Sequence, residues 1–272
     1  MMDGTGHLAT TLQRARGKAD VAFRQGDLAR LYQSGAAKAL LPRSYGTAHE
    51  VVLVNTAGGI TGGDHFAYDC SSDASRVIVT TQAAERAYRS STTDIASMKI
   101  RLRAKDGASL HWLPQETILF DGSRLDRQID VDLDADSECL ILESLVFGRH
   151  AMGELLRNCH FTDRWRIRQN GQLLHAEALS LADDSNSLLG MAAGGAGAQM
   201  AATLVYAGPR LEQVHADINA VLPTTGSRMA ISHWKGRCVL RLLASSTMTG
   251  KSDLSRILSS IHGQQIPRVW QS

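Results

Sequence analysis

The chain has 272 residues, of which 43% are hydrophobic, and a formal net charge of +2 at pH 7. That length can bury the core of one large domain or two small ones, and the near-neutral charge gives no reason to expect nucleic acid or an anionic membrane as a partner. Four cysteines without a CxxC pair exclude a zinc ribbon and a dense disulfide framework, which favours a reducing cytosol. Because the first 20 residues lack an apolar secretory core and no apolar run reaches the roughly 18 residues of a membrane span, we expect a cytoplasmic protein.

The first notable segment is "NTAGGITGGDHFAYD" (55–69), which follows the apolar run 51–54. A phosphate cradle, a metal site and a tight crossing between strands are three interpretations of its glycines. A phosphate loop would continue with Lys-Ser or Lys-Thr, but Asp64 and His65 follow Gly63. A dinucleotide fingerprint would continue as a helix, whereas "HFAYDCSS" alternates like a strand. The pattern therefore favours a tight crossing, where glycine avoids a clash.

Three segments then repeat one plan, in which an alternating strand, a turn with aspartate and serine, and a second apolar strand follow one another. They are "DHFAYDCSSDASRVIVTTQ", "ASMKIRLRAKDGASLHWLPQ" and "RQIDVDLDADSECLILES", with Asp73, Asp106 and Asp134 in the turns. They recur roughly every 30 residues, a period typical of stacked units with a shared core. Chance similarity among ordinary hairpins is the alternative. Either interpretation predicts β structure over residues 50–147.

The last third of the chain is mixed. Residues 208–223 carry apolar side chains at helical spacing between two prolines, "CVLRLLAS" is predicted as a strand, and "LSRILSSIHG" as a short helix closed by Gly263. We therefore expect one domain over residues 1–272. It should be mainly β, with stacked antiparallel or solenoid-like sheets and a few helices in the C-terminal third.

Signatures of catalysis and of tight metal binding are missing from the sequence. There is no GxSxG elbow, no signature of a thiol enzyme, and no HxH, HExxH or CxxC spacing. Acids next to apolar runs are more informative, because an unpaired buried charge is costly. Glu143 interrupts "CLILESLVFG", Glu177 lies in "LLHAEALSL", and Asp64 ends the glycine motif. A structural role is the alternative for each acid, with these arginines as possible partners: Arg86, Arg89, Arg124 and Arg149.

Five segments occur in one order across almost the whole chain: "GGITGGD" (58–64), "TTQAAERAYRS" (80–90), "LPQETILFDGSRLDR" (113–127), "FGRHAMGE" (147–154) and "IPRVW" (266–270). Together they resemble the urease accessory protein D family, called H in some organisms. "TAGGI" lacks the proline that often precedes the glycines, and "AAER" replaces a common threonine–lysine pairing. We expect a structural role for the matching residues Gly58, Gly59, Gly62, Gly63, Arg89, Gln115, Gly122, Arg124, Gly148 and Arg149.

The resemblance implies a scaffold that is not an enzyme. Members of this family bind apo-urease and accessory protein F directly, reach accessory protein G through F, and support GTP-dependent insertion of nickel. The GTPase activity resides in protein G, which agrees with the missing phosphate loop. No tightly bound cofactor is expected, and nickel would be bound only in transit. An uncharacterised β-rich hydrolase or binding protein is the alternative.

Nickel in transit needs ligands that bind and also release it. Scattered carboxylates, hydroxyls and waters suit this purpose better than a cage of thiolates. Given the resemblance, we expect Asp64, Glu143 and Glu177 to line a transient nickel path.

Overall fold

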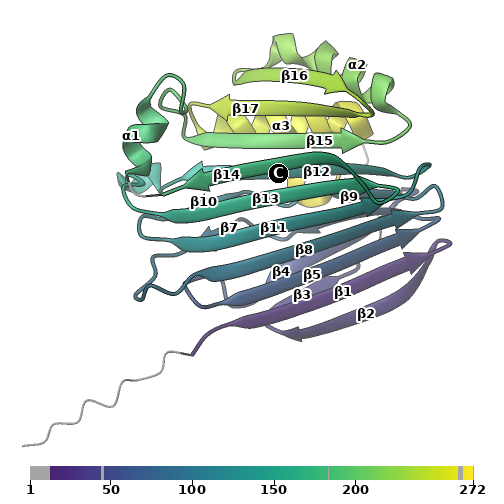
Figure 1. The fold of residues 1–272 in the computed structure, drawn as a ribbon, viewed down its shortest axis with the longest axis horizontal. Helices are drawn as coiled ribbons and strands as arrows, with labels where there is room; N and C mark the ends of the chain where they lie inside the picture. The colour runs from purple at the N-terminus through teal and green to yellow at the C-terminus, as the bar shows by residue number, and fades with distance from the viewer. Residues whose placement is uncertain (1–12, 44–45, 183, 263–265, 272) are drawn as a thin grey trace, which may run out of the picture.

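Two β-sheets face each other in the computed structural model, which describes residues 13–43, 46–182, 184–262 and 266–271 (Figure 1). The seven-stranded sheet has the order β14 (Gln172–Leu181), β13 (His160–Gln169), β11 (Arg124–Leu133), β8 (Ala96–Lys105), β5 (His65–Asp73), β1 (Arg16–Arg24) and β2 (Asp27–Gly35). The ten-stranded sheet has the order β16 (Arg228–Trp234), β17 (Arg237–Ala244), β15 (Met200–Ala207), β12 (Glu138–Phe147), β9 (Ser109–Trp112), β6 (Arg76–Thr81), β4 (His49–Asn55) and β3 (Ala37–Leu40). Its short strands β7 (Glu85–Ala87) and β10 (Thr117–Leu119) pair with each other, and β10 also pairs with β12.

The chain winds between the two sheets as a solenoid. Each repeat identified in the sequence places its first strand in the seven-stranded sheet and its second strand in the other, as β5 and β6 show. Successive coils stack in parallel register, with His65 opposite Ser97 and Ser97 level with Asp126. The solenoid-like prediction is confirmed, and the hairpin alternative is wrong because the two strands of a repeat do not pair. Antiparallel pairing occurs at both ends, for example between β1 and β2 and between β12 and β15.

The aspartates of the repeat tie adjacent coils together at the turns. The Asp134 carboxylate accepts a hydrogen bond from the backbone N–H of Asp106 in the preceding coil, and another from that of Ser137 in its own turn. Asp106 has a φ of +54°, a conformation that aspartate tolerates better than most side chains. The recurring Asp and Ser residues thus mark the corners of the solenoid.

Three α-helices and three 3₁₀ helices complete the described chain. They are α1 (Ser185–Gly190), α2 (Leu211–Val221), α3 (Thr247–His262), η1 (His150–Met152), η2 (Leu222–Thr224) and η3 (Arg268–Trp270). The prediction for α2 is confirmed. Helix α3 begins earlier than the predicted Leu254, because Ser246 Oγ accepts a hydrogen bond from Thr249 N (3.1 Å) and caps the first turn. The predicted stop at Gly263 lies outside the described residues.

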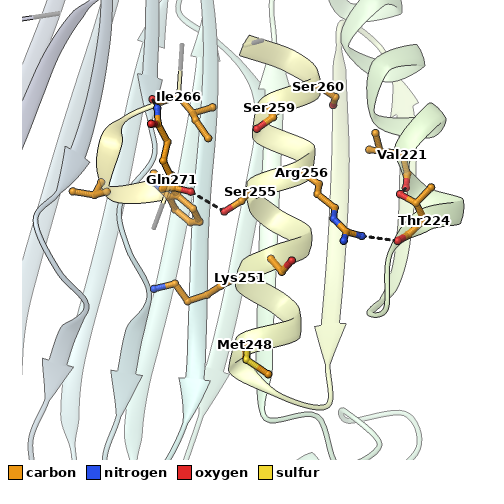
Figure 2. Close-up of a pocket in the computed structure, with 13 residues that line it drawn as sticks. Val221, Thr224, Met248, Lys251, Ser255, Arg256, Ser259, Ser260, Ile266 and Gln271 are labelled. Carbon is orange, nitrogen blue, oxygen red and sulfur yellow. Dashed lines mark hydrogen bonds between the residues drawn. The ribbon is translucent and has the colours of Figure 1, made fainter. Parts of the chain in front are cut away.

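The closing "IPRVW" motif fastens the C-terminal segment to the ten-stranded sheet and to α3. Trp270 is buried, and its Nε1 donates a hydrogen bond to Leu113 O (2.9 Å). Ser255 Oγ of α3 donates one to Trp270 O (3.0 Å) (Figure 2). Within the described chain, no helix is long and apolar enough to cross a membrane.

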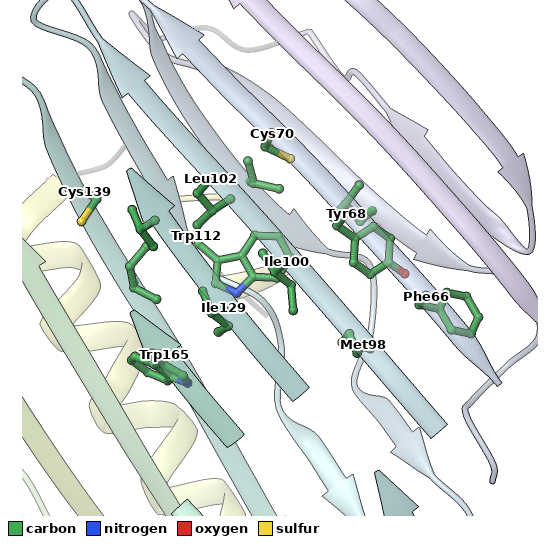
Figure 3. Packing of buried hydrophobic residues seen from close by; sticks show 14 of the residues in the cluster. Phe66, Tyr68, Cys70, Met98, Ile100, Leu102, Trp112, Ile129, Cys139 and Trp165 are labelled. Carbon is green, nitrogen blue, oxygen red and sulfur yellow. The ribbon is translucent and has the colours of Figure 1, made fainter. Parts of the chain in front are cut away.

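The main core fills the space between the two sheets. Tyr68, Ile100, Ile129 and Trp165 occupy one register level on β5, β8, β11 and β13, and all four are buried (Figure 3). A second apolar cluster lies between the ten-stranded sheet and the helices α2 and α3. Strand β12 contributes to both clusters and is buried along its whole length, which explains why apolar residues flank Glu143 and Ser144 on both sides without alternating.

Candidate functional site

The glycine motif forms a tight crossing against the segment that contains β7. Ile60 makes an isolated parallel bridge to Ala87. A Cβ on Gly59 would lie 2.3 Å from the ring of Tyr88, and one on Gly62 would lie 2.2 Å from Ser90 Oγ. Gly58 and Gly63 have φ values of +77° and +87°, and Gly59 also has a positive φ. The structure therefore confirms the crossing, and these glycines are required by close approach and by backbone conformation.

Asp64 closes this crossing with its buried carboxylate. Its Oδ1 accepts a hydrogen bond from Ala15 N (2.7 Å) and its Oδ2 accepts one from Thr61 N (2.8 Å). The side chain thereby joins the start of β1 to the glycine loop. This bonding supports a structural role, and a role of Asp64 in nickel transfer stays a prediction.

A buried ion cluster occupies the register level next to the apolar one described above. There, Phe66 and Met98 are followed by Arg127 and Asp163 on the next two strands. Arg127 donates from Nε to Asp163 Oδ1 (3.0 Å) and from Nη2 to Asp163 Oδ2 (2.6 Å). Its Nη1 donates to Thr117 Oγ1 (3.1 Å) and to Glu143. At this level, the inward face of the sheet is therefore apolar on β5 and β8 and charged on β11 and β13.

Glu143 meets this cluster from the facing sheet. Its side chain is 4% exposed, and Oε1 accepts a hydrogen bond from Trp112 Nε1 (2.8 Å). Burial raises the pKa of Glu143 to about 7, although the nearby Arg127 opposes this rise; Asp163 adds to it. When Glu143 and Asp163 are both ionised, the single positive charge of Arg127 leaves one negative charge uncompensated inside the protein.

Glu177 completes the polar layer from the edge strand β14. Its Oε2 accepts a hydrogen bond from Arg241 Nη2 (2.6 Å). Arg241 lies level with Thr203, and Thr203 lies level with Glu143, so three polar side chains follow one line across β17, β15 and β12. The arginine partners predicted for these acids were wrong: Arg127 and Arg241 are the partners of Glu143 and Glu177. The prediction did not consider arginines at inward positions of the strands, such as Arg127.

Two cavities, both partly open to solvent, meet at the ion cluster. One has a volume of about 110 Å³ and the other about 470 Å³, and both are lined by Arg127 and Glu143. Glu177 and Asp163 line only the larger cavity. The structure thus brings Glu143 and Glu177 together around one cavity, whereas Asp64 is absent from the described lining of both.

Glu85 is a further acid at this site that the sequence analysis missed. It lines the smaller cavity, and its carboxylate accepts hydrogen bonds from Asn55 Nδ2 (3.1 and 3.2 Å). Burial raises the pKa of Glu85 to about 6, with the Asn55 hydrogen bonds opposing this rise. Within the described ranges, no group of three or more His, Cys, Asp or Glu side chains is arranged to hold a metal ion.

A third, larger groove has a lining that differs from that of the two cavities. A groove of about 950 Å³ runs along α3 towards η3, lined by serines together with Lys251 and Arg256 (Figure 2). None of the described residues that line it is Asp or Glu. The groove therefore presents cationic side chains, whereas carboxylates line the two cavities at the ion cluster.

Comparison with known proteins decides the family. The family model described as "UreD urease accessory protein" matches residues 14–271. The chain belongs to this family. Urease accessory protein UreD of Jannaschia sp. (strain CCS1) is 43% identical over 264 residues, which is 96% of this chain and 97% of that protein. The UreD proteins of Rhizobium rhizogenes and Paracoccus denitrificans are 41% and 40% identical, and each alignment covers 96% of this chain and 97% and 93% of the relative.

Several residues of the UreD motifs hold together the loops that lead into β8 and β11. Arg89 Nη2 donates to Asp121 Oδ2 (2.6 Å), and a Cβ on Gly122 would lie 2.9 Å from Arg89 Cγ. Gly122 has a φ of +78°. Arg124 Nε donates to Thr93 O (3.1 Å). This bonding agrees with the structural role that we expected for Arg89, Gly122 and Arg124.

The other UreD motif residues join separate parts of the chain. Gln115 lies between the sheet and the C-terminal segment, where its Nε2 donates to Val269 O (3.2 Å). Arg149 pairs with Glu154 (3.1 Å) and stacks over Phe120. Gly148 has a φ of +80°, and a Cβ there would lie 2.9 Å from Glu154 O. These contacts support the structural role expected for the three residues, which stays a prediction.

Proposed function

We propose that this protein is a urease maturation scaffold that is not an enzyme. It binds apo-urease and accessory protein F directly, reaches accessory protein G through F, and supports GTP-dependent insertion of nickel. Membership of the UreD family, whose relatives carry the name urease accessory protein, supports this role over that of a β-rich hydrolase. In this proposal, accessory protein G supplies the GTPase activity that nickel insertion requires.

The observation that carries the nickel part of the proposal is the buried Arg127–Glu143–Asp163 cluster between two cavities. Its excess negative charge favours a proton or a cation. Because the raised pKa of Glu143 lies close to neutral pH, this carboxyl group can exchange its proton for a metal ion under cellular conditions. Oxygen ligands on Ni²⁺ are weaker than thiolates, so the ion can leave again.

The path that we propose passes from one cavity to the other. Glu85 receives nickel in the smaller cavity, Glu143 transfers it at the shared wall, and Glu177 receives it in the larger cavity. Both oxygens of Glu143 already accept hydrogen bonds, from Trp112 and Arg127. A nickel ion at Glu143 therefore shares the carboxylate with these two donors, which weakens its binding there and eases its release.

Glutamine variants test this proposal because they keep side-chain volume and remove the charge. We expect Glu143→Gln and Glu177→Gln to lower the nickel content and activity of urease in cells several-fold. Pull-down of apo-urease and of accessory protein F should be unchanged. The matched control is Glu212→Gln, an exposed acid in the first turn of α2.

Two results would overturn parts of the proposal separately. Normal urease nickel content in both cavity variants would exclude the path but leave the scaffold role standing. Failure of the wild-type protein to bind accessory protein F at micromolar concentration would exclude the scaffold role itself.

A further inference from the structure

Two solvent-accessible histidines meet where α2 lies beside the edge strand β16, at the upper end of the molecule in Figure 1. His215 Nε2 of α2 lies 3.2 Å from His233 Nδ1 of β16. The ring centroids are 4.1 Å apart and the ring planes are tilted by 56°. Neither residue lines the two cavities at the ion cluster, so this pair is separate from the proposed nickel path.

Core packing and strand pairing fix the backbone that carries the two histidines. His215 follows Val214, which is fully buried together with Ile218, so the helix is anchored to the core on both sides of this turn. The amide of Asn219, one turn further along α2, lies 3.0 Å from His215 Nε2 and 3.3 Å from its Nδ1, and it rests against the ring. His233 is held in register opposite Cys238 of β17.

The spacing of the two nitrogens fits one shared metal ion. With metal–nitrogen bonds of about 2.1 Å, two neighbouring ligand nitrogens lie roughly 3.0–3.4 Å apart, depending on geometry. The observed 3.2 Å falls in this range, and a small rotation of two exposed rings directs both lone pairs at one point. A hydrogen bond between exposed imidazoles contributes little because water competes for it. An ion bound by both rings gains from chelation instead.

We propose that His215 and His233 form a bidentate surface site for divalent transition-metal ions, with water at the remaining positions. Imidazole suits Cu²⁺, Ni²⁺ and Zn²⁺, and Cu²⁺ should bind most tightly. Nickel bound here lies outside the proposed path. Measurements of total nickel binding by the intact protein therefore contain this site as well as the carboxylates.

Titration of the intact protein with NiCl₂ in a calorimeter tests the site. We expect His215→Ala and His233→Ala each to weaken the site at least tenfold. The double variant should be no weaker than the single variants, because one remaining imidazole no longer chelates. His65→Ala is the matched control: His65 is also exposed, but its Nδ1 bonds to Ser97 Oγ (2.7 Å) instead of facing a second histidine.

Electron paramagnetic resonance of bound Cu²⁺ gives an independent readout on the wild-type protein. We expect splitting from two nitrogen ligands, and from one in each single variant. Nickel affinity that is unchanged in the folded double variant would overturn the proposal, as would a wild-type copper spectrum without two nitrogen ligands. Neither result bears on Glu143 and Glu177, so the site and the nickel path are tested separately.

Discussion

Arg127 shows how a single residue marks the site and why the sequence analysis missed it. It occupies an inward position of β11, between the buried Leu125 and Ile129, where alternation requires an apolar side chain. Asp163 stands at the equivalent inward position of β13, between Phe161 and Trp165. Both exceptions are visible in the sequence. Their pairing was not, because it depends on the parallel register that brings β11 and β13 side by side.

The chemistry of Glu143 leads to a prediction at the residue scale. Its pKa is raised from 4.5 to about 7 in the folded protein, so the folded state binds this proton more tightly than the unfolded state. The stabilisation is complete below about pH 4.5 and is lost as the pH rises to about 7. Glu143→Gln removes this dependence. We therefore compare the unfolding free energy of Glu143→Gln with that of wild type at each pH. From pH 5 to pH 8 this difference should shift in favour of the variant by on the order of 2–3 kcal/mol.

Urea denaturation at several pH values, followed by tryptophan fluorescence, measures this difference. Glu212→Gln serves again as the exposed control and should give no trend. A constant difference between Glu143→Gln and wild type across this range would show that Glu143 is ionised throughout. The proton exchange invoked for nickel transfer would then be excluded.

At the scale of elements, the sequence predicted the alternating strands and α2, because one buried face imposes a period that the residues reveal. The attachment of α3 was not predictable. The Nε2 atom of its C-terminal His262 lies within hydrogen-bond distance (3.1 Å) of Nδ1 of His111 on β9, across 151 positions of the chain. On its other side, His111 Nε2 contacts Ser109 Oγ (3.0 Å), which donates to Glu138 (2.8 Å). Such a contact depends on the packing of the helix on the sheet.

These histidines predict how α3 responds to acid. Burial lowers the pKa of His111, and burial together with His111 and Arg210 lowers that of His262 to about 3. Glu138 opposes both shifts, whereas Arg76 adds to the shift of His111. Since the unfolded chain binds these protons more readily, the stabilisation is complete above about pH 6.5 and is lost as the pH falls below that value, for His262 down to about pH 3.

The measurement is again urea unfolding, now at pH 7.5 and pH 5.5. For each histidine we expect wild type to lose up to about 1.4 kcal/mol per pH unit below 6.5. His262→Gln keeps a neutral hydrogen-bonding group and should lose less over this interval. An equal loss in both proteins would mean that His262 titrates in the folded protein as it does in the unfolded chain, against the lowered pKa that its burial causes.

The whole molecule explains why the polar layer lies where it does. Along the solenoid the two sheets face each other coil by coil, but after β13 they end differently. The seven-stranded sheet stops with β14, which folds back antiparallel on β13, whereas the other sheet continues through β15, β17 and β16. The larger cavity lies at this mismatch and is lined from β12, β13, β14, β15 and β17. The sequence analysis recognised the repeat but had no means of locating its end as the place for the cavity.

The last prediction follows from this architecture and concerns access to the larger cavity. Strand β14 pairs only with β13, and most of its side chains are exposed, whereas β11 is paired on both sides and buried on every second residue. Local opening of β14 therefore costs less free energy than opening of β11. We expect hydrogen–deuterium exchange to be faster for the amides of β14 than for those of β11. Because Arg241 holds β14 through its bond to Glu177, Arg241→Ala should speed amide exchange in β14 and leave the exchange rates of β11 unchanged. Equal protection of both strands in wild type would mean that the larger cavity does not open through its edge strand.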